Sequence, residues 1–163
     1  MTNNDILRRF RYALDISNPK MIEIFSFAEV TIDQETLLSL LKKEEEEGFI
    51  DCSNALLESF FDGFITFKRG ARDGADSKPL ATSMEKERVN NTILRKMRIA
   101  LEFKDEDMLA VMNLAGVVVT KSELGALFRG KGHKNYKECG DQFLRSFLNG
   151  LTSRYRGHTA DPA

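Results

Sequence analysis

The sequence contains no tryptophan, and its 163 residues include only two cysteines, two histidines and three prolines. Structural zinc centres are usually built from four cysteine and histidine ligands, so a chain with two of each has little material for them. The two cysteines, Cys52 and Cys139, cannot form a disulfide-rich scaffold. We therefore expect no metal, no cofactor and no disulfide.

Long apolar runs are also absent. The longest, such as Leu114 to Val119, fall far short of the roughly 18 residues that span a bilayer. The segment Met1–Asp5 has neither the basic part nor the apolar part of an export signal. We expect a cytoplasmic protein with reduced thiols and no membrane partner.

Motifs for catalysis are scarce. No glycine-rich phosphate loop, nucleophile elbow or paired-histidine zinc motif is present. His133 lies near Cys139 and Asp141, but this spacing matches no standard zinc site. We therefore predict no catalytic, cofactor-binding or metal-binding residues and a protein that is not an enzyme. The alternative to this prediction is an enzyme whose pocket the sequence does not reveal.

The dominant feature that is present is an internal repeat. Shifted by 87 residues, the chain aligns with itself without a gap, residues 3–70 on residues 90–157, with 20 identities in 68 positions. A match this long indicates a duplicated structural unit. Residues 71–89 are polar and contain Gly74 and Pro79, which predicts a linker, and residues 158–163 are expected to form a loose tail.

Each copy has the apolar spacing of four helices. In the first copy we expect a helix at about residues 5–15 capped by Asn4, and a second that has Asn18 as its cap and Pro19 at its first position. A third helix follows Asp33 and runs to Glu47, and a fourth covers about residues 53–68. The predicted fold is all-α: a tandem repeat of two similar four-helix modules, which a pseudo-twofold axis could relate.

Small residues recur inside the predicted fourth helices. Gly63 follows Ser59 by four residues, and Gly150 follows Ser146 in the same way. Glycine costs a helix about 1 kcal/mol relative to alanine, so these positions need a reason. Either another helix approaches closely there, such as the fourth helix of the other copy, or each glycine fits a crowded place inside its own repeat.

Charge is divided between the two copies. Residues 3–70 contain 8 basic and 13 acidic residues, a net charge of −5, whereas residues 90–157 contain 12 and 7, a net charge of +5. The acidic run Glu44–Glu47 aligns with the basic stretch 131–134. These stretches are either solvated helix ends, or surfaces through which repeats attract one another within or between chains, or a basic surface for an anionic partner.

Three pairs of residues retained in both copies have open roles. The first predicted helices carry Arg8 and Arg11, and Arg95 and Arg98, as candidate contacts for a partner or an anion, with pairing to helix ends as the alternative. Cys52 and Cys139 precede the fourth helices, where a helix N-terminus can lower a thiol pKa, although simple buried packing is the alternative.

The second copy also resembles a helix-turn-helix. A helix over residues 107–115, then Gly116, then a helix that follows Thr120 would place basic side chains toward a phosphate backbone. The candidate nucleic-acid contacts are Lys121, Ser122, Arg129, Lys131 and Lys134. The connection is longer than the usual turn of 3–4 residues, and the first copy has Glu29 in place of the glycine and the glutamate run.

Several stretches resemble one family of bacterial proteins. They are residues 4–8 with Arg11 and Tyr12, residues 41–44 with 46–49, residues 98–101 and residues 133–145. These resemble the YehS-like proteins, the domain-of-unknown-function family 1456. The resemblance covers both copies and implies tandem helical domains in a bacterial cytoplasm. It implies no catalytic residue.

From the sequence we expect a non-enzymatic helical-repeat protein, an adaptor or regulatory module that binds a protein partner or forms a homo-oligomer. The alternative is a nucleic-acid-binding regulator that uses the second repeat.

Overall fold

The computed structural model describes residues 1–69, 89–129 and 134–156, and these residues form eight helices and no strand. The first repeat contains α1 (Asn3–Leu14), α2 (Asn18–Phe27), α3 (Gln34–Leu40) and α4 (Asn54–Arg69). The second contains α5 (Val89–Leu101), α6 (Asp105–Leu114), α7 (Lys121–Leu127) and α8 (Asp141–Arg156). The prediction of an all-α tandem repeat is confirmed. The predicted linker, except Val89, and the predicted tail lie outside the described residues.

The helix starts follow local capping rules, with two differences from the predicted caps. Thr2, not Asn4, caps α1, and its hydroxyl accepts a hydrogen bond from the Asp5 N–H. Ser17, not Asn18, caps α2. The spacing of Thr120 and Glu123 predicts a capping box, and this box is present at the start of α7. Asn4 does not cap α1 as predicted, because its side chain contacts other parts of the chain.

Helix α3 is much shorter than predicted, since it ends at Leu40 rather than Glu47. The carbonyl groups of Leu40 and Leu41 accept hydrogen bonds from side chains of α1, which stops the helical hydrogen-bond pattern there. Extending the helix would also place Glu44–Glu47 at its C-terminal end, where the helix dipole disfavours negative charge. The glutamate run forms turns instead.

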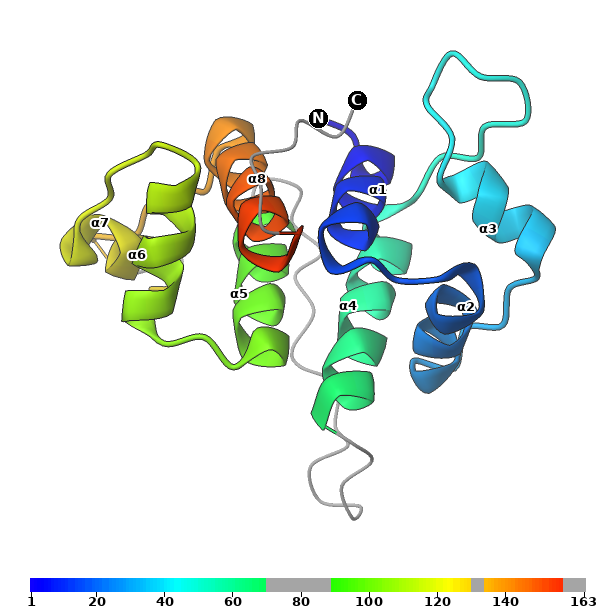
Figure 1. Ribbon diagram of the computed structural model, residues 1–163, viewed down its shortest axis with the longest axis horizontal. Coiled ribbons are helices and arrows are strands. Elements are labelled where there is room, and N and C mark those ends of the chain that lie inside the picture. Colours follow the sequence, from blue (N-terminus) through cyan, green and yellow to red (C-terminus); the bar gives the residue numbers. More distant parts are fainter. Residues whose placement is uncertain (70–88, 130–133, 157–163) are drawn as a thin grey trace.

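The repeats are joined through four central helices (Figure 1). Helix α1 packs against α8, and α4 packs against α5. Exchanging the two copies converts the first of these contacts into the second, as a pseudo-twofold axis requires. The α2–α3 pair lies on one side of this central group, and the α6–α7 pair lies on the other (Figure 1). No helix in the described part of the chain has the length and apolar character needed to cross a membrane.

The cores of the two repeats use the same positions with different side chains. In the first repeat Phe10 makes edge-to-face contacts with three other phenylalanine rings of α4, at centroid distances of 4.9–6.2 Å. At the position of Phe10 the second repeat has Met97, which is also fully buried. The duplicated apolar pattern therefore preserves burial rather than residue identity.

The two helical glycines face helices of their own repeats. A Cβ atom added at Gly63 would lie 2.0 Å from the carbonyl oxygen of Ile24 in α2. One added at Gly150 would lie 2.1 Å from that of Val111 in α6. The small residues therefore allow close helix contact, but the partner is not the fourth helix of the other copy. Ser59 and Ser146 share the α4 and α8 stripes, and the Ser146 hydroxyl accepts a hydrogen bond from Gln142.

Candidate functional site

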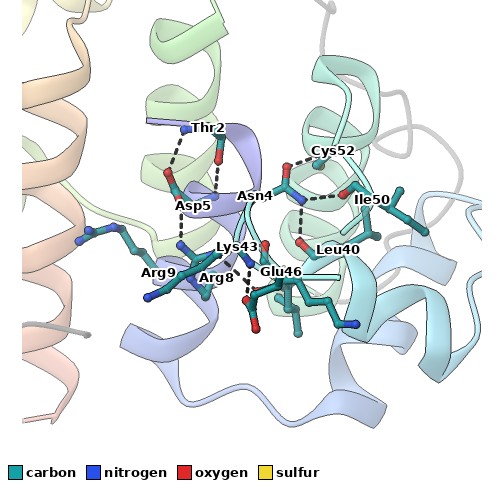
Figure 2. Close-up of polar contacts among 12 residues, drawn as sticks. Thr2, Asn4, Asp5, Arg8, Arg9, Leu40, Lys43, Glu46, Ile50 and Cys52 are labelled. Carbon is teal, nitrogen blue, oxygen red and sulfur yellow. Dashed lines mark hydrogen bonds and ion pairs between the residues drawn. The ribbon is translucent and has the colours of Figure 1, made fainter. Parts of the chain in front are cut away.

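The pair Asn3-Asn4 and its counterpart Asn90-Asn91 hold each repeat together. The Asn4 amide donates to the carbonyls of Leu40 and Ile50, at 2.8 Å each, and its oxygen accepts from the Cys52 N–H at 2.9 Å (Figure 2). Asn91 makes the three equivalent bonds at 2.8–3.0 Å. Because Asn4 is 1% exposed, these bonds are made away from water. The shared asparagines therefore fix the segment that follows α3 or α7.

The candidate arginines Arg8 and Arg95 extend the same network. Arg8 lies 3.5 Å from the carbonyl oxygens of Leu41 and Lys42, and Arg95 donates to the carbonyl of Phe128 at 2.9 Å. Both guanidinium groups thus cap the C-terminal end of the third helix in their repeat, where positive charge is favoured. Arg8 also pairs with Asp5. Hydrogen bonds from Thr2 and Arg8 lower the pKa of Asp5 although burial opposes this.

The other two candidate arginines, Arg11 and Arg98, fix the start of the second helix. Arg11 donates to the Asn18 side chain at 2.6 Å, and Arg98 donates to Asp105 at 2.7 Å. Arg98 also lies over the ring of Phe128, with 4.8 Å to the centroid. The four arginines are therefore divided among separate helix ends and do not converge on one anion site.

A cavity of about 410 Å³ lies where the first turns of α1, α4, α5 and α8 meet. Its polar walls include Asn3 and Asn90, which donate to Asn54 and Asp141 at 2.7 and 2.9 Å. The hydrogen bond from Asn90 lowers the pKa of Asp141. The N-terminal ammonium group of Met1 lies 3.3 Å from the same carboxylate. Of these three contacts, the first two lie within one repeat each, and the ion pair of Met1 with Asp141 joins the two repeats.

The cysteines are buried and unsuited to nucleophilic chemistry. Burial, assisted by the negative charge of Asp51, raises the pKa of the Cys52 thiol to about 12. Burial also raises the pKa of Cys139 to about 12, together with the charges of Asp141 and Glu138. The structure therefore excludes a thiol pKa lowered by the helix N-terminus, because desolvation of the thiolate dominates.

The surface around α3 carries exposed acidic and apolar side chains. We define the acidic end as residues 33–51, which comprise α3 and the segment after it. Its glutamates Glu44–Glu47 are exposed, and Leu38 and Ile50 are 43% and 44% exposed. The Ile50 N–H donates to the carbonyl of Ser39 next to Leu38, which brings the two apolar residues onto neighbouring stretches. Apolar side chains thus lie among carboxylates.

The equivalent surface of the second repeat, formed by residues 120–129 and 134–138, is basic. We define these residues as the basic end. Of the candidate nucleic-acid contacts, Lys121, Ser122 and Lys134 are exposed and Arg129 is half-buried, whereas Lys131 lies outside the described residues, as does His133. The N–H of Lys137 donates to the carbonyl of Ala126 and holds its segment against α7.

Helices α6 and α7 pack against each other, as a helix-turn-helix would, but the connection runs through residues 115–120. The first turn of α6 contains three acidic residues, Asp105, Glu106 and Asp107. Glu106 lies 4.0 Å from the ammonium of Lys121 and offsets part of its charge. In the first repeat Glu29 adopts a left-handed φ of 61° where the second has Gly116, so both connections share one backbone form.

Comparison with known proteins agrees with this two-fold organisation. The family described as "Protein of unknown function (DUF1456)" matches residues 3–70 and again residues 90–157, the two copies of the repeat. The "Uncharacterized protein YehS" of Escherichia coli (strain K12) is 41% identical over 154 residues, which cover 94% of this chain and 96% of that protein. No solved structure matches the chain. The chain therefore belongs to the DUF1456 family.

Proposed function

We propose that this protein is a non-enzymatic interaction module that binds a protein partner through the outer ends of its repeats. The single observation that supports this most is the exposure of Leu38 and Ile50 among the glutamates of the acidic end. An apolar centre bordered by charged side chains is the usual composition of a protein interface.

A comparison of the two copies supports the same proposal. The residues identical in both copies hold the scaffold: Asn4 and Asn91 bind the segment after the third helix, and Gly63 and Gly150 allow close packing. The outer ends, by contrast, have the same backbone anchors and opposite charge. Selective contacts are therefore expected at the ends, where the copies differ.

Affinity capture from a nuclease-treated bacterial lysate tests the proposal, with the full chain as bait. Leu38→Asp should remove the captured partner, because a carboxylate at the centre of an apolar contact would be desolvated without a counterion. Leu114→Asp is the matched control, because Leu114 is 45% exposed on α6 and lies outside the two ends. Capture that is unchanged in Leu38→Asp, or no protein retained above an empty-resin control, contradicts the proposal.

A second candidate function, nucleic-acid binding, is supported by the gathering of basic groups around the end of α7. Arg95 binds the carbonyl of Phe128, Arg129 reaches the carbonyl of Asn135, and Lys134 and Lys137 are exposed nearby. Such a cluster could contact phosphates. Fluorescence anisotropy with a labelled duplex at low salt tests it: Lys134→Glu/Lys137→Glu should weaken any binding at least tenfold, and absence of binding by the wild type rejects it.

A further inference from the structure

Most of the charge difference between the repeats lies at their outer ends. The acidic end, residues 33–51, contains seven acidic and two basic residues, a net charge of −5. The basic end, residues 120–129 and 134–138, contains four basic and two acidic residues, a net charge of +2. The acidic end thus accounts for the whole net charge of −5 of the first repeat.

The two ends cannot neutralise each other within one molecule. Helices α3 and α7 lie at opposite ends of the longest axis, with the four central helices between them (Figure 1). Because whole helices, each about 10 Å across, separate α3 from α7, the two ends lie further apart than the Debye length of about 8 Å at physiological salt, and their charges are screened from one another. The alternative of attraction between these two surfaces inside one chain is therefore wrong for this fold.

The equivalent positions of the two ends also differ in size. Leu38 of the acidic end corresponds to Gly125 of the basic end, and Ile50 corresponds to Lys137. A Cβ atom added at Gly125 would meet only the Arg129 side chain, at 3.8 Å, so there is room above this glycine. One end thus presents an exposed apolar side chain, and the other has space beside basic groups.

From the opposite charges and this difference in size, we infer that the acidic end of one copy docks on the basic end of a second copy. The inference rests on the proposed function, since it names a partner for the same surfaces. Complementary charge steers and orients such a contact, and the exposed Leu38 supplies apolar area to bury. The contact joins two different surfaces, so each pair retains one free end of each sign, and assembly grows with concentration.

Sedimentation velocity of the purified full chain tests the inference. At about 20 mM salt the weight-average sedimentation coefficient should rise with protein concentration, and about 500 mM salt should weaken association at least tenfold. Glu44→Lys/Glu45→Lys and Lys134→Glu/Lys137→Glu should each be monomeric. All four side chains are exposed, so both variants should fold, which circular dichroism checks.

A matched control distinguishes the effect of where the substituted charges lie from the effect of the protein's net charge. Glu23→Lys/Glu29→Lys changes the net charge by the same amount as the acidic-end variant, at exposed positions outside both ends. It should associate like the wild type. Mixing the two end variants should restore association as a one-to-one pair, because Glu44→Lys/Glu45→Lys retains the basic end and Lys134→Glu/Lys137→Glu retains the acidic end.

Three results would overturn the inference. They are a wild type that stays monomeric at low salt, a control that dissociates as much as Glu44→Lys/Glu45→Lys, and a mixture of folded end variants that does not associate. The proposed function is judged separately, because a monomeric protein that still captures a lysate partner through Leu38 keeps that function and loses only this partner.

Discussion

The ammonium of Lys96 in α5 lies 2.5 Å from a carboxylate oxygen of Asp62 in α4, which joins the two repeats through a buried ion pair. The Lys96 side chain is 1% exposed and that of Asp62 is 21% exposed. At the pseudo-equivalent positions Arg9 of α1 lies 3.4 Å from the side-chain oxygen of Asn149 in α8. In one of the two related contacts the basic side chain faces a carboxylate, and in the other it faces a neutral amide.

Removing Asp62 should destabilise the protein, because the charge of Lys96 would stay buried without its partner. Asp62→Ala should lower the free energy of unfolding by about 2–4 kcal/mol, somewhat less than for a fully buried pair. The double variant Lys96→Met/Asp62→Leu should recover most of this loss, since apolar residues replace both charges. Urea unfolding of the three proteins measures it, and equal losses in the single and double variants would argue against a charge effect.

The periodic sequence pattern predicted the helices well, because it records which side of each helix is buried. It predicted the fourth helix of each repeat, observed at α4 and α8, and the capping box at Thr120. It did not predict which helices face each other, since an apolar stripe does not identify its partner. The packing of α1 on α8 follows from the tertiary structure alone.

The local sequence pattern did not predict contacts between side chains and backbone groups that lie far apart in the chain. Asn4 was expected at a helix start, but its amide binds Leu40 and Ile50, which are 36 and 46 residues away. The same contacts end α3 early, and the only local sign against a longer helix is the negative charge of Glu44–Glu47, which a helix C-terminal end disfavours. Within-chain comparison offered one usable signal: Asn4 and Arg8 are identical in the second copy, as expected of residues that bind a shared backbone.

The buried asparagine gives a second stability prediction. Asn4→Asp should cost about 2–3 kcal/mol, because a carboxylate cannot donate to the carbonyls of Leu40 and Ile50 and would lie between two acceptors. Asn91→Asp should behave alike, since it loses the equivalent bonds. Asn113→Asp on the exposed end of α6 should stay within about 0.5 kcal/mol of the wild type. Denaturant unfolding that ranks Asn4→Asp with Asn113→Asp would refute the network's importance.

Replacing a helical glycine with alanine should destabilise the protein at Gly63 and Gly150 but stabilise it at Gly125. Gly63→Ala and Gly150→Ala should each lower the free energy of unfolding by more than about 3 kcal/mol, because the new Cβ would meet a backbone carbonyl at 2.0–2.1 Å. Gly125→Ala in α7 has room and should stabilise by about 0.5–1 kcal/mol through helix propensity. Thermal midpoints that fall for all three, or for none, would contradict the assignment of close helix contact.

The two cysteines of the native protein are expected to resist thiol reagents. The pKa of Cys52 and of Cys139 is raised from 9.0 to about 12, so near pH 8 the native protein holds ~1,000-fold less thiolate than the unfolded chain. Native protein should therefore react at least that much more slowly with a thiol-specific disulfide reagent than protein in urea. Equal rates before and after unfolding would show that the thiols are accessible and ionised.

The same pKa shifts predict how stability depends on alkaline pH. Because the folded-state pKa is raised, the neutral thiols stabilise the fold fully below about pH 9, and this contribution is lost as pH rises from 9 toward 12. Urea midpoints measured between pH 8 and pH 11 should fall more steeply for the wild type than for Cys52→Ala/Cys139→Ala. That variant retains every lysine and tyrosine, so it subtracts their titration. Parallel slopes in the two proteins would mean that ionisation of the thiols does not limit stability, and that burial of the two sulfur atoms is incomplete in solution.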